Sequence, residues 1–360
     1  MKEIKDIYNS TLQINLKNIE KNYNYLKSKA PKTIIAACVK ANSYGLGSEQ
    51  ICKTLYKQNC RNFFVATLKE ALLLRKKYKY INIYMLNGAN DLESYCKVLK
   101  FNIIVVINNL HQLFILKELV KKNKKKIKCC LHFDTGMNRL GLKIQDLSKY
   151  VDFFQRHLDV KLVISHLISS EKKTVSNDNQ LKLFNAIKNK NYFSKKTLFS
   201  IGNSNAIFLN NKFHFDMIRA GGFIYGLNLT KKNKSKNVLS LKAKIIQIEY
   251  VKKDQSIGYG AKYITKKDSI IATLAIGYAD GLPRNYDGFV FYKKRKVKFV
   301  GNISMDLSCI DISSIKNPKI NDWVEIFGSN ISISAFASKC NTITYEVSSK
   351  IGLRVKRIYN

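Results

Sequence analysis

Eight short apolar runs, each separated from the next by a longer stretch, dominate the first two thirds of this chain. The intervening stretches include five with helical apolar spacing, at residues 49–57, 69–76, 91–99, 110–120 and 180–188. The apolar runs predict strands at residues 34–39, 63–66, 81–86, 103–107, 127–133, 160–165, 197–201 and 215–218. Because strands that alternate with helices form parallel sheets, eight such units predict an α/β fold with a closed, TIM-like (β/α)8 barrel. An open doubly wound sheet is the alternative, but no GxGxxG motif follows the first run.

The pattern changes after the hydrophilic stretch at residues 230–237. Beyond it, short apolar segments with turn signals such as Asp287-Gly288 leave little room for helices. Strands are predicted at residues 297–300, 324–327 and 331–333. Since 360 residues also exceed the usual size of one domain, the sequence predicts a barrel domain over residues 1–237 and a mostly β domain over residues 238–360.

Composition argues against several classes of protein. The net charge of +38 would attract nucleic acid, but the lysines recur along the whole chain and no run falls in a nucleic-acid-binding fold motif. No apolar stretch is long enough to span a bilayer, and the first residues lack the apolar core of a signal peptide. The eight cysteines form no CxxC pair. We therefore expect a cytoplasmic protein with reduced thiols, no metal site, and neither nucleic acid nor membrane as a partner.

Lys40 is the first candidate for chemistry. It stands where the first apolar run ends, in the segment VKANSYGLG at residues 39–47. Burying an ammonium group is costly unless it is paired or its pKa falls. A lysine at this junction is therefore a candidate amine nucleophile that forms a Schiff base. An ordinary solvated lysine at a strand end is the alternative.

Other polar residues follow the later apolar runs, and barrels build their active sites from the C-terminal ends of their strands. These residues are Asp134 to Arg139 after the fifth run, His166 after the sixth, Asn203 and Ser204 after the seventh, and Arg219, Gly221 and Gly222 after the eighth. Barrels commonly bind phosphate after strands seven and eight, through backbone N–H groups and hydroxyls. A cofactor with a phosphate there and an aldehyde at Lys40 matches pyridoxal phosphate, which acts as an electron sink.

Several of these side chains have two interpretations each. His166 is either a core histidine or a ring stacked on the cofactor. Arg139 either forms a surface ion pair or holds a carboxylate bidentately. Arg219 either pairs with an acid such as Asp216 or donates to the pyridine nitrogen. Tyr259 stands between two glycines, so its hydroxyl can project into a cleft and exchange a proton with carbon.

Taken together, these motifs resemble the alanine racemase family, nearly end to end. The matching segments are residues 39–45, 134–141, 165–166, 203–204, 216–219, 225–226, 259–260, 276–281, 305–306 and 345–346. The resemblance implies a homodimeric racemase, dependent on pyridoxal phosphate, that interconverts L-alanine and D-alanine and supplies D-alanine for peptidoglycan.

The resemblance also implies residue roles. Lys40 would hold the cofactor and act as one base, and Tyr259 of the partner subunit would act as the other from the opposite face. The residues implied to bind the cofactor are Lys40, Tyr44, His166, Asn203, Ser204, Arg219, Gly221, Gly222 and Tyr345. The resemblance implies that Arg139 and the backbone N–H of Met305 hold the carboxylate of the substrate. It also implies that Tyr278 and Tyr345 narrow the entrance of the active site.

Four positions depart from the usual family pattern. His132 stands where many relatives carry a lysine that braces the arginine, so the orientation of Arg139 must be set differently. Leu46 replaces a common histidine, Ala220 a proline and Ser304 a frequent cysteine. None of these changes removes a catalytic group, but they leave substrate preference open.

Three alternative functions stay open beside alanine racemisation. One is a racemase for serine or another amino acid, and another is an amino-acid decarboxylase of the same architecture. The third is a non-enzymatic pyridoxal phosphate carrier, although such barrel proteins lack a second domain.

Overall fold

The eight predicted strands form one parallel sheet in the computed structural model, which describes residues 7–121, 126–227 and 235–360. They are β2 (Ile34–Cys38), β3 (Asn62–Val65), β4 (Asn82–Met85), β5 (Ile104–Ile107), β6 (Ile127–His132), β7 (Leu158–Ile164), β8 (Leu198–Ser200) and β9 (Met217–Ala220). Their order runs from β8 through β7 down to β2 and then to β9. The backbone bonds from Asp216 N to Phe199 O and from Arg219 N to Gly202 O, both 3.1 Å, join the two end strands. The prediction of a TIM-like barrel is confirmed.

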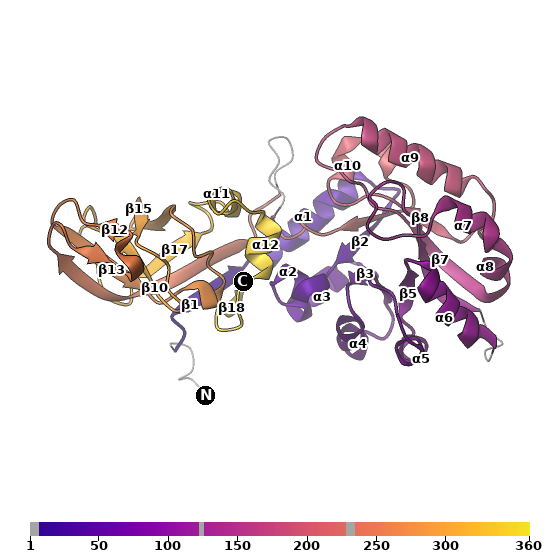
Figure 1. Ribbon diagram of the computed structural model, residues 1–360, viewed down its shortest axis with the longest axis horizontal. Helices are drawn as coiled ribbons and strands as arrows, with labels where there is room; N and C mark the ends of the chain where they lie inside the picture. Colours follow the sequence, from indigo (N-terminus) through magenta and orange to yellow (C-terminus); the bar gives the residue numbers. More distant parts are fainter. Residues whose placement is uncertain (1–6, 122–125, 228–234) are drawn as a thin grey trace.

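Helices surround this sheet (Figure 1). They are α1 (Leu16–Lys29), α2 (Lys40–Tyr44), α3 (Ser48–Lys57), α4 (Leu68–Lys77), α5 (Leu92–Lys100), α6 (Leu110–Lys121), α7 (Ile144–Lys149), α8 (Val151–His157), α9 (Val175–Lys188) and α10 (Ala206–Leu209), followed by the 3-10 turn η2 (Asn211–Phe213). The five predicted helices are all present, with different ends. For example, α9 begins at Val175 rather than at residue 180, because the Thr174 side chain accepts a hydrogen bond from Asn177 N and caps the helix there.

The barrel strands are buried on both faces. Alternate residues such as Phe64, Tyr84 and Cys130 fill the inside of the barrel, whereas Phe63 and Cys129 pack in the larger core. Neighbouring residues in one strand thus belong to different apolar clusters, as the period of two along a strand requires.

The second domain is a mostly antiparallel sheet (Figure 1). Its elements are β10 (Leu239–Val251), β11 (Ser256–Ile257), η3 (Tyr259–Ala261), β12 (Tyr263–Ile264), β13 (Ser269–Leu274), η4 (Tyr278–Asp280), β14 (Phe289–Tyr292), β15 (Arg295–Val300), β16 (Ser308–Asp311), β17 (Trp323–Phe327), α11 (Ile333–Lys339), α12 (Thr344–Ser349) and β18 (Lys356–Tyr359). The N-terminal strand β1 (Ser10–Ile14) also joins this sheet, antiparallel to β10 and parallel to β18. The first strand of the chain therefore completes the second sheet.

One predicted strand is wrong. Residues 331–333 lead into α11 instead, because the Ser332 side chain accepts a hydrogen bond from Ala335 N at 3.1 Å and caps a helix. With α12 following it, the second domain has more helix than the sequence suggested. The hydrophilic break predicted at residues 230–237 lies mostly outside the described residues.

Two further observations concern the described residues alone. No helix among them has the length and apolar character needed to cross a membrane. No group of three or more His, Cys, Asp or Glu side chains there is arranged to hold a metal ion. All eight cysteines are free thiols.

Candidate active site

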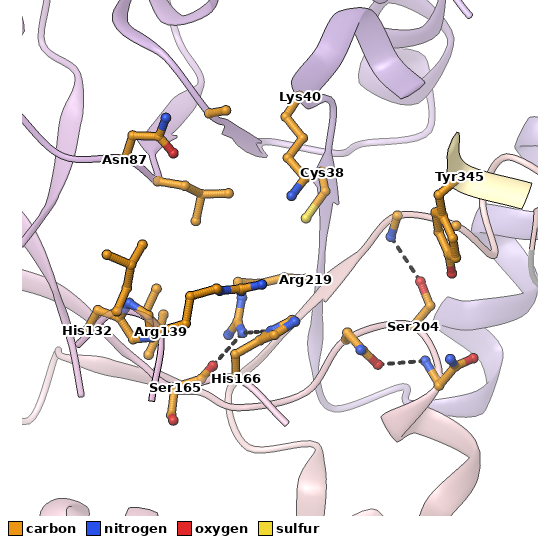
Figure 2. A pocket seen from close by; sticks show the side chains of 18 of the residues that line it. Cys38, Lys40, Asn87, His132, Arg139, Ser165, His166, Ser204, Arg219 and Tyr345 are labelled. Carbon is orange, nitrogen blue, oxygen red and sulfur yellow. Dashed lines mark hydrogen bonds between the residues drawn. The ribbon is translucent and has the colours of Figure 1, made fainter. Parts of the chain in front are cut away.

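A cavity of about 440 Å³ opens at the carboxyl ends of the barrel strands (Figure 2). Ten predicted site residues line it, namely Lys40, Tyr44, Arg139, His166, Asn203, Ser204, Arg219, Gly221, Gly222 and Tyr345. Of the described residues that line the cavity, Tyr345 alone comes from the second domain, where it lies on α12. The fold thus gathers side chains from most of the barrel strands, and one from the second domain, around a single space.

Lys40 follows β2 and extends into the cavity, with its amine beside Cys38 (Figure 2). The expectation of a buried lysine is wrong, because Lys40 is exposed. Within the described ranges its amine has no hydrogen-bond or ion-pair partner. The amine is therefore available to a ligand in the cavity.

The backbone after Lys40 has an unusual conformation. Ala41, Asn42, Ser43 and Tyr44 have φ values of 51°, 52°, 54° and 58°, so α2 is largely a left-handed turn. Such a conformation costs an L-residue about 1–2 kcal/mol. Gly45 ends the turn at φ 87°, with its N–H donating to Ala41 O. The turn directs the Tyr44 side chain toward the glycine pair that follows β9.

Gly221 and Gly222 lie where two tyrosine hydroxyls converge. The Ser204 hydroxyl accepts a hydrogen bond from Gly221 N at 2.9 Å. A Cβ on Gly221 would lie 2.6 Å from the Tyr44 hydroxyl oxygen, and one on Gly222 would collide with the Tyr345 hydroxyl. Burial raises the pKa of both tyrosines, so their hydroxyls stay neutral and can donate. Three hydroxyls and the glycine backbone form a polar cradle of the kind that binds phosphate.

Arg219 lies within β9, rather than after the strand as predicted, and is buried. Its Nη1 donates to the Ser200 carbonyl at 2.8 Å and to the Ser200 hydroxyl at 2.6 Å, and its Nη2 donates to the Ser165 carbonyl at 2.6 Å. Nη2 also lies 3.2 Å from Nδ1 of His166. The interpretation that Arg219 forms an ion pair with Asp216 is wrong, because the Asp216 carboxylate accepts the backbone N–H of Phe199 instead.

Two neutral histidines line the cavity. Burial, with the charge of Arg219 as the next cause, lowers the pKa of His166 to about 3 and that of His132 to about 4. The Nδ1 of His132 lies 2.8 Å from Asn108 Oδ1. Because the Asn108 amide nitrogen donates to the Leu86 carbonyl, its oxygen is the acceptor, and His132 carries its proton on Nδ1.

Arg139 lines the same cavity and is exposed. The surface ion pair considered from the sequence is wrong, because Arg139 has no ion-pair or hydrogen-bond partner in the part of the chain that the structure describes. A free guanidinium facing the cavity can hold a carboxylate.

Three predicted site residues lie outside the cavity. Tyr259, Tyr278 and Met305 belong to the second domain, and they are 72%, 42% and 54% exposed. The loops that carry them lie together, since the Asn302 amide donates to Tyr259 O at 2.9 Å and Tyr278 N donates to Ser304 O at 3.0 Å. A single chain does not bring these side chains to its own cavity.

Several further residues of the cavity were not predicted from the sequence. Asn87, Asn108 and Glu171 line the cavity as well. Asn87 and Asn108 directly follow the predicted strands at residues 81–86 and 103–107. A polar residue after an apolar run is the signal that identified Lys40, and it would have found both asparagines.

Comparisons with known proteins agree with this geometry. The family model of the alanine racemase N-terminal domain matches residues 14–229, and that of the C-terminal domain matches residues 238–359. The alanine racemase of Rickettsia akari (strain Hartford) is 39% identical over 356 residues, which cover 97% of this chain and 98% of the relative. Among solved structures, alanine racemase from Bartonella henselae with covalently bound pyridoxal phosphate has a TM-score of 0.92 and 32% identity, covering 98% of this chain and 99% of that one. Biosynthetic alanine racemase from Pseudomonas aeruginosa has a TM-score of 0.90 and 28% identity, covering 98% of this chain and 100% of that one.

Proposed function

The chain belongs to the alanine racemase family, and from that premise we propose that it interconverts L-alanine and D-alanine with Lys40 and Tyr259 as opposed bases. The proposal includes pyridoxal phosphate as the cofactor and supply of D-alanine for peptidoglycan as the role. The observation that carries it is the cradle at Gly221 and Gly222, which shares one cavity with the amine of Lys40.

The cavity residues fit pyridoxal phosphate. Tyr44, Ser204, Tyr345 and the glycine backbone would hold its phosphate, and Lys40 would hold its aldehyde carbon. When bound, the cofactor supplies an electron sink for the negative charge that develops at the substrate's α-carbon.

Arg219 would contact the pyridine nitrogen. Four of its five N–H groups are directed to Ser200, Ser165 and His166, which leaves Nε–H for a ligand. A guanidinium donates and cannot accept, so the pyridine nitrogen opposite it would stay unprotonated. An unprotonated ring is a weaker electron sink, which favours return of a proton over side reactions such as transamination.

The proton transfers need one base on each side of the substrate. The amine of Lys40 would remove or return the α-proton on one side, and the phenol of Tyr259 would act on the other. Arg139 and the backbone N–H of Met305 would hold the substrate carboxylate. Because Tyr259 and Met305 are exposed on the second domain, we propose a homodimer in which each cavity is completed by the partner subunit.

The proposed substrate rests on the comparisons, and the proposed location rests on the cysteines. Alanine is preferred to serine because the relatives are named alanine racemases. No specific observation favours the decarboxylase or the carrier interpretation. A cytoplasmic location agrees with eight free thiols, which a reducing compartment maintains.

Incubation of the purified protein with L-alanine in D2O tests the activity. We expect D-alanine by chiral separation, with deuterium at Cα. Release of carbon dioxide without a D-product would support the decarboxylase, and bound cofactor without turnover would support the carrier.

Two variants test the residue roles. Lys40→Ala should abolish the absorbance of the lysine–cofactor linkage. Tyr259→Phe should retain that absorbance and lose racemisation. Full activity of Tyr259→Phe would show that the two-base assignment is wrong.

A further inference from the structure

The left-handed turn after Lys40 is held at both ends by residues distant in the sequence. We propose that Glu70, from the barrel, and Arg357 with Tyr359, from the second domain, are positioning residues that keep this turn in the shape that directs Lys40 into the cavity. This inference rests on the proposed function, because it assumes that Lys40 holds the cofactor. None of the three residues lines the cavity.

Glu70 holds the start of the turn. One carboxylate oxygen accepts the N–H of Ala41, the peptide directly after Lys40, at 2.6 Å. The other oxygen accepts the N–H groups of Ala66 and Thr67 at 2.8 and 3.2 Å. Hydrogen bonds to a charged acceptor are stronger than neutral ones. The carboxylate thereby ties the Lys40–Ala41 peptide to the loop between β3 and α4.

Arg357 and Tyr359 hold the end of the turn. Arg357 donates to Gly45 O through Nε at 3.2 Å and Nη2 at 3.1 Å. Its other hydrogen bonds go to carbonyls of the second domain, including Val355 O at 2.9 Å. The Tyr359 hydroxyl donates to Leu46 O at 2.9 Å. The last strand of the chain, β18, is therefore bonded to the turn through two consecutive carbonyls.

The second domain also leaves no space for side chains on this turn. A Cβ on Gly45 would collide with the Ser348 carbonyl on α12, and one on Gly47 would collide with the Tyr359 hydroxyl. The same helix α12 carries Tyr345 into the cavity. Docking of the second domain thus determines two things at once, the place of Tyr345 and the conformation of the turn that carries Lys40.

The physical reason for such anchors is the left-handed conformation itself. Four successive L-residues at positive φ are unfavourable in an unconstrained chain. Bonds at both ends of the turn keep it from relaxing to an extended or right-handed form, either of which would redirect Lys40. Loss of an anchor should therefore slow attachment of the cofactor to Lys40 without removing any group that touches the cofactor.

Tyr359→Phe, compared with Tyr23→Phe, is the sharpest test. Each removes one hydroxyl that donates to a backbone carbonyl at 2.9 Å, but the Tyr23 bond goes to Ile35, at the opposite end of β2 from Lys40. The full-length apoprotein is mixed with pyridoxal phosphate, and attachment is followed by absorbance and, after borohydride reduction, by mass spectrometry. We expect similar thermal stability for the two variants, with attachment slowed about two- to tenfold in Tyr359→Phe alone.

Glu70→Gln gives a second measure on the barrel side. The amide keeps one acceptor oxygen and replaces the other with a donor, so Ala41 N or Ala66 N loses its partner. We expect attachment to slow about tenfold, because the lost bond goes to a charged group. The control is Glu93→Gln, which removes the same charge from the exposed first turn of α5.

The outcomes separate this inference from the proposed function. If the unmodified protein attaches no cofactor at Lys40, or does not racemise alanine, the proposed function fails. If it does both, and Tyr359→Phe and Glu70→Gln attach the cofactor as fast as their controls, the anchoring role is wrong. Slowed attachment with a stability equal to that of the controls supports it, since a merely structural loss would lower the stability together with the rate.

Discussion

Acidification from pH 7 to pH 5 should destabilise the cofactor-free protein through two cavity histidines. The folded-state pKa values of His132 and His166 are about 4 and about 3, against 6.5 as their ordinary value. The fold therefore favours the neutral rings, and the unfolded chain binds more protons at pH 5. The stabilising contribution is complete above the unfolded pKa and is lost as the pH falls through 6.5 toward the folded values.

The magnitude follows from linkage. At pH 5 an unfolded histidine is about 97% protonated, whereas a folded one with a pKa of 4 or below is at most about 10% protonated. Each ring thus takes up about 0.9 proton on unfolding and costs about 2 kcal/mol of stability between pH 7 and pH 5. The result depends mainly on the unfolded pKa, because both folded values lie at least one pH unit below 5.

The two rings differ in what opposes their protonation. His166 Nδ1 faces the Nη2 donor of Arg219 at 3.2 Å, so a proton there would set two donors against each other. His132 donates from Nδ1 to Asn108, and protonation at its other nitrogen would leave that bond intact. Burial and the charges of Arg219 and Arg139 are what disfavour the charged His132.

The number of protons that each histidine binds on unfolding can be measured directly, without a model of the unfolding transition. Protein is unfolded in denaturant at pH 5 in a pH-stat, and the protons bound are counted for the unmodified chain, His132→Gln and His166→Gln. Each substitution should reduce the uptake by about 0.9 proton. His111→Gln is the control for loss of an exposed imidazole. An uptake unchanged in His132→Gln would refute the reasoning, because it would mean that His132 is already protonated in the fold at pH 5.

Three further predictions concern the cavity. Gly222→Ala should raise the Kd of pyridoxal phosphate about ten- to hundredfold in a spectroscopic titration, because the new Cβ collides with the Tyr345 hydroxyl. In a Tyr345→Ala background, which lacks that hydroxyl, the same substitution should raise the Kd much less. Arg139→Lys should raise KM for alanine at least about tenfold and change kcat much less, since an ammonium cannot form the bidentate pair. Mixing the inactive variants Lys40→Ala and Tyr259→Phe should restore up to about one quarter of the activity of the unmodified protein. Half of the dimers formed would contain one subunit of each variant, and each of these mixed dimers would hold one intact site. No recovery of activity after verified subunit exchange would contradict shared sites.

The barrel was predictable because its strands are short, apolar and buried on both faces. The run at residues 103–107 is bounded by Asn102 and Asn108, and β5 occupies Ile104–Ile107 with every residue buried. Polar residues that follow such runs lie at the carboxyl rim of the barrel, and so Lys40, His166 and Ser204 meet in one cavity. The position of a polar residue relative to the predicted strands was therefore the best guide to the active site.

What could not be predicted depends on long-range partners. β1 consists of only Ser10–Ile14, and its place in the second sheet is decided by pairing with β10 and β18, at the far end of the chain. Residues 331–333 have the composition of a strand, but the local cap at Ser332 favours a helix. Arg219 was predicted to follow the eighth strand, which was given as residues 215–218, but it lies within β9. A charged residue inside a barrel strand is costly, and the acceptors from Ser165 and Ser200 make that place tolerable.

The conformation of the turn after Lys40 could not be predicted from the sequence either, although this turn carries the lysine proposed to hold the cofactor. Its sequence, KANSYG, contains no glycine until Gly45 and does not by itself favour positive φ at Ala41 or Tyr44. The conformation is determined by Glu70, 29 residues beyond Ala41, and by Arg357, 312 residues beyond Gly45. The turn therefore has hydrogen-bond partners in both domains. The lysine proposed to hold the cofactor is therefore placed by the completed tertiary structure, which is why its sequence neighbours identify it but cannot describe its geometry.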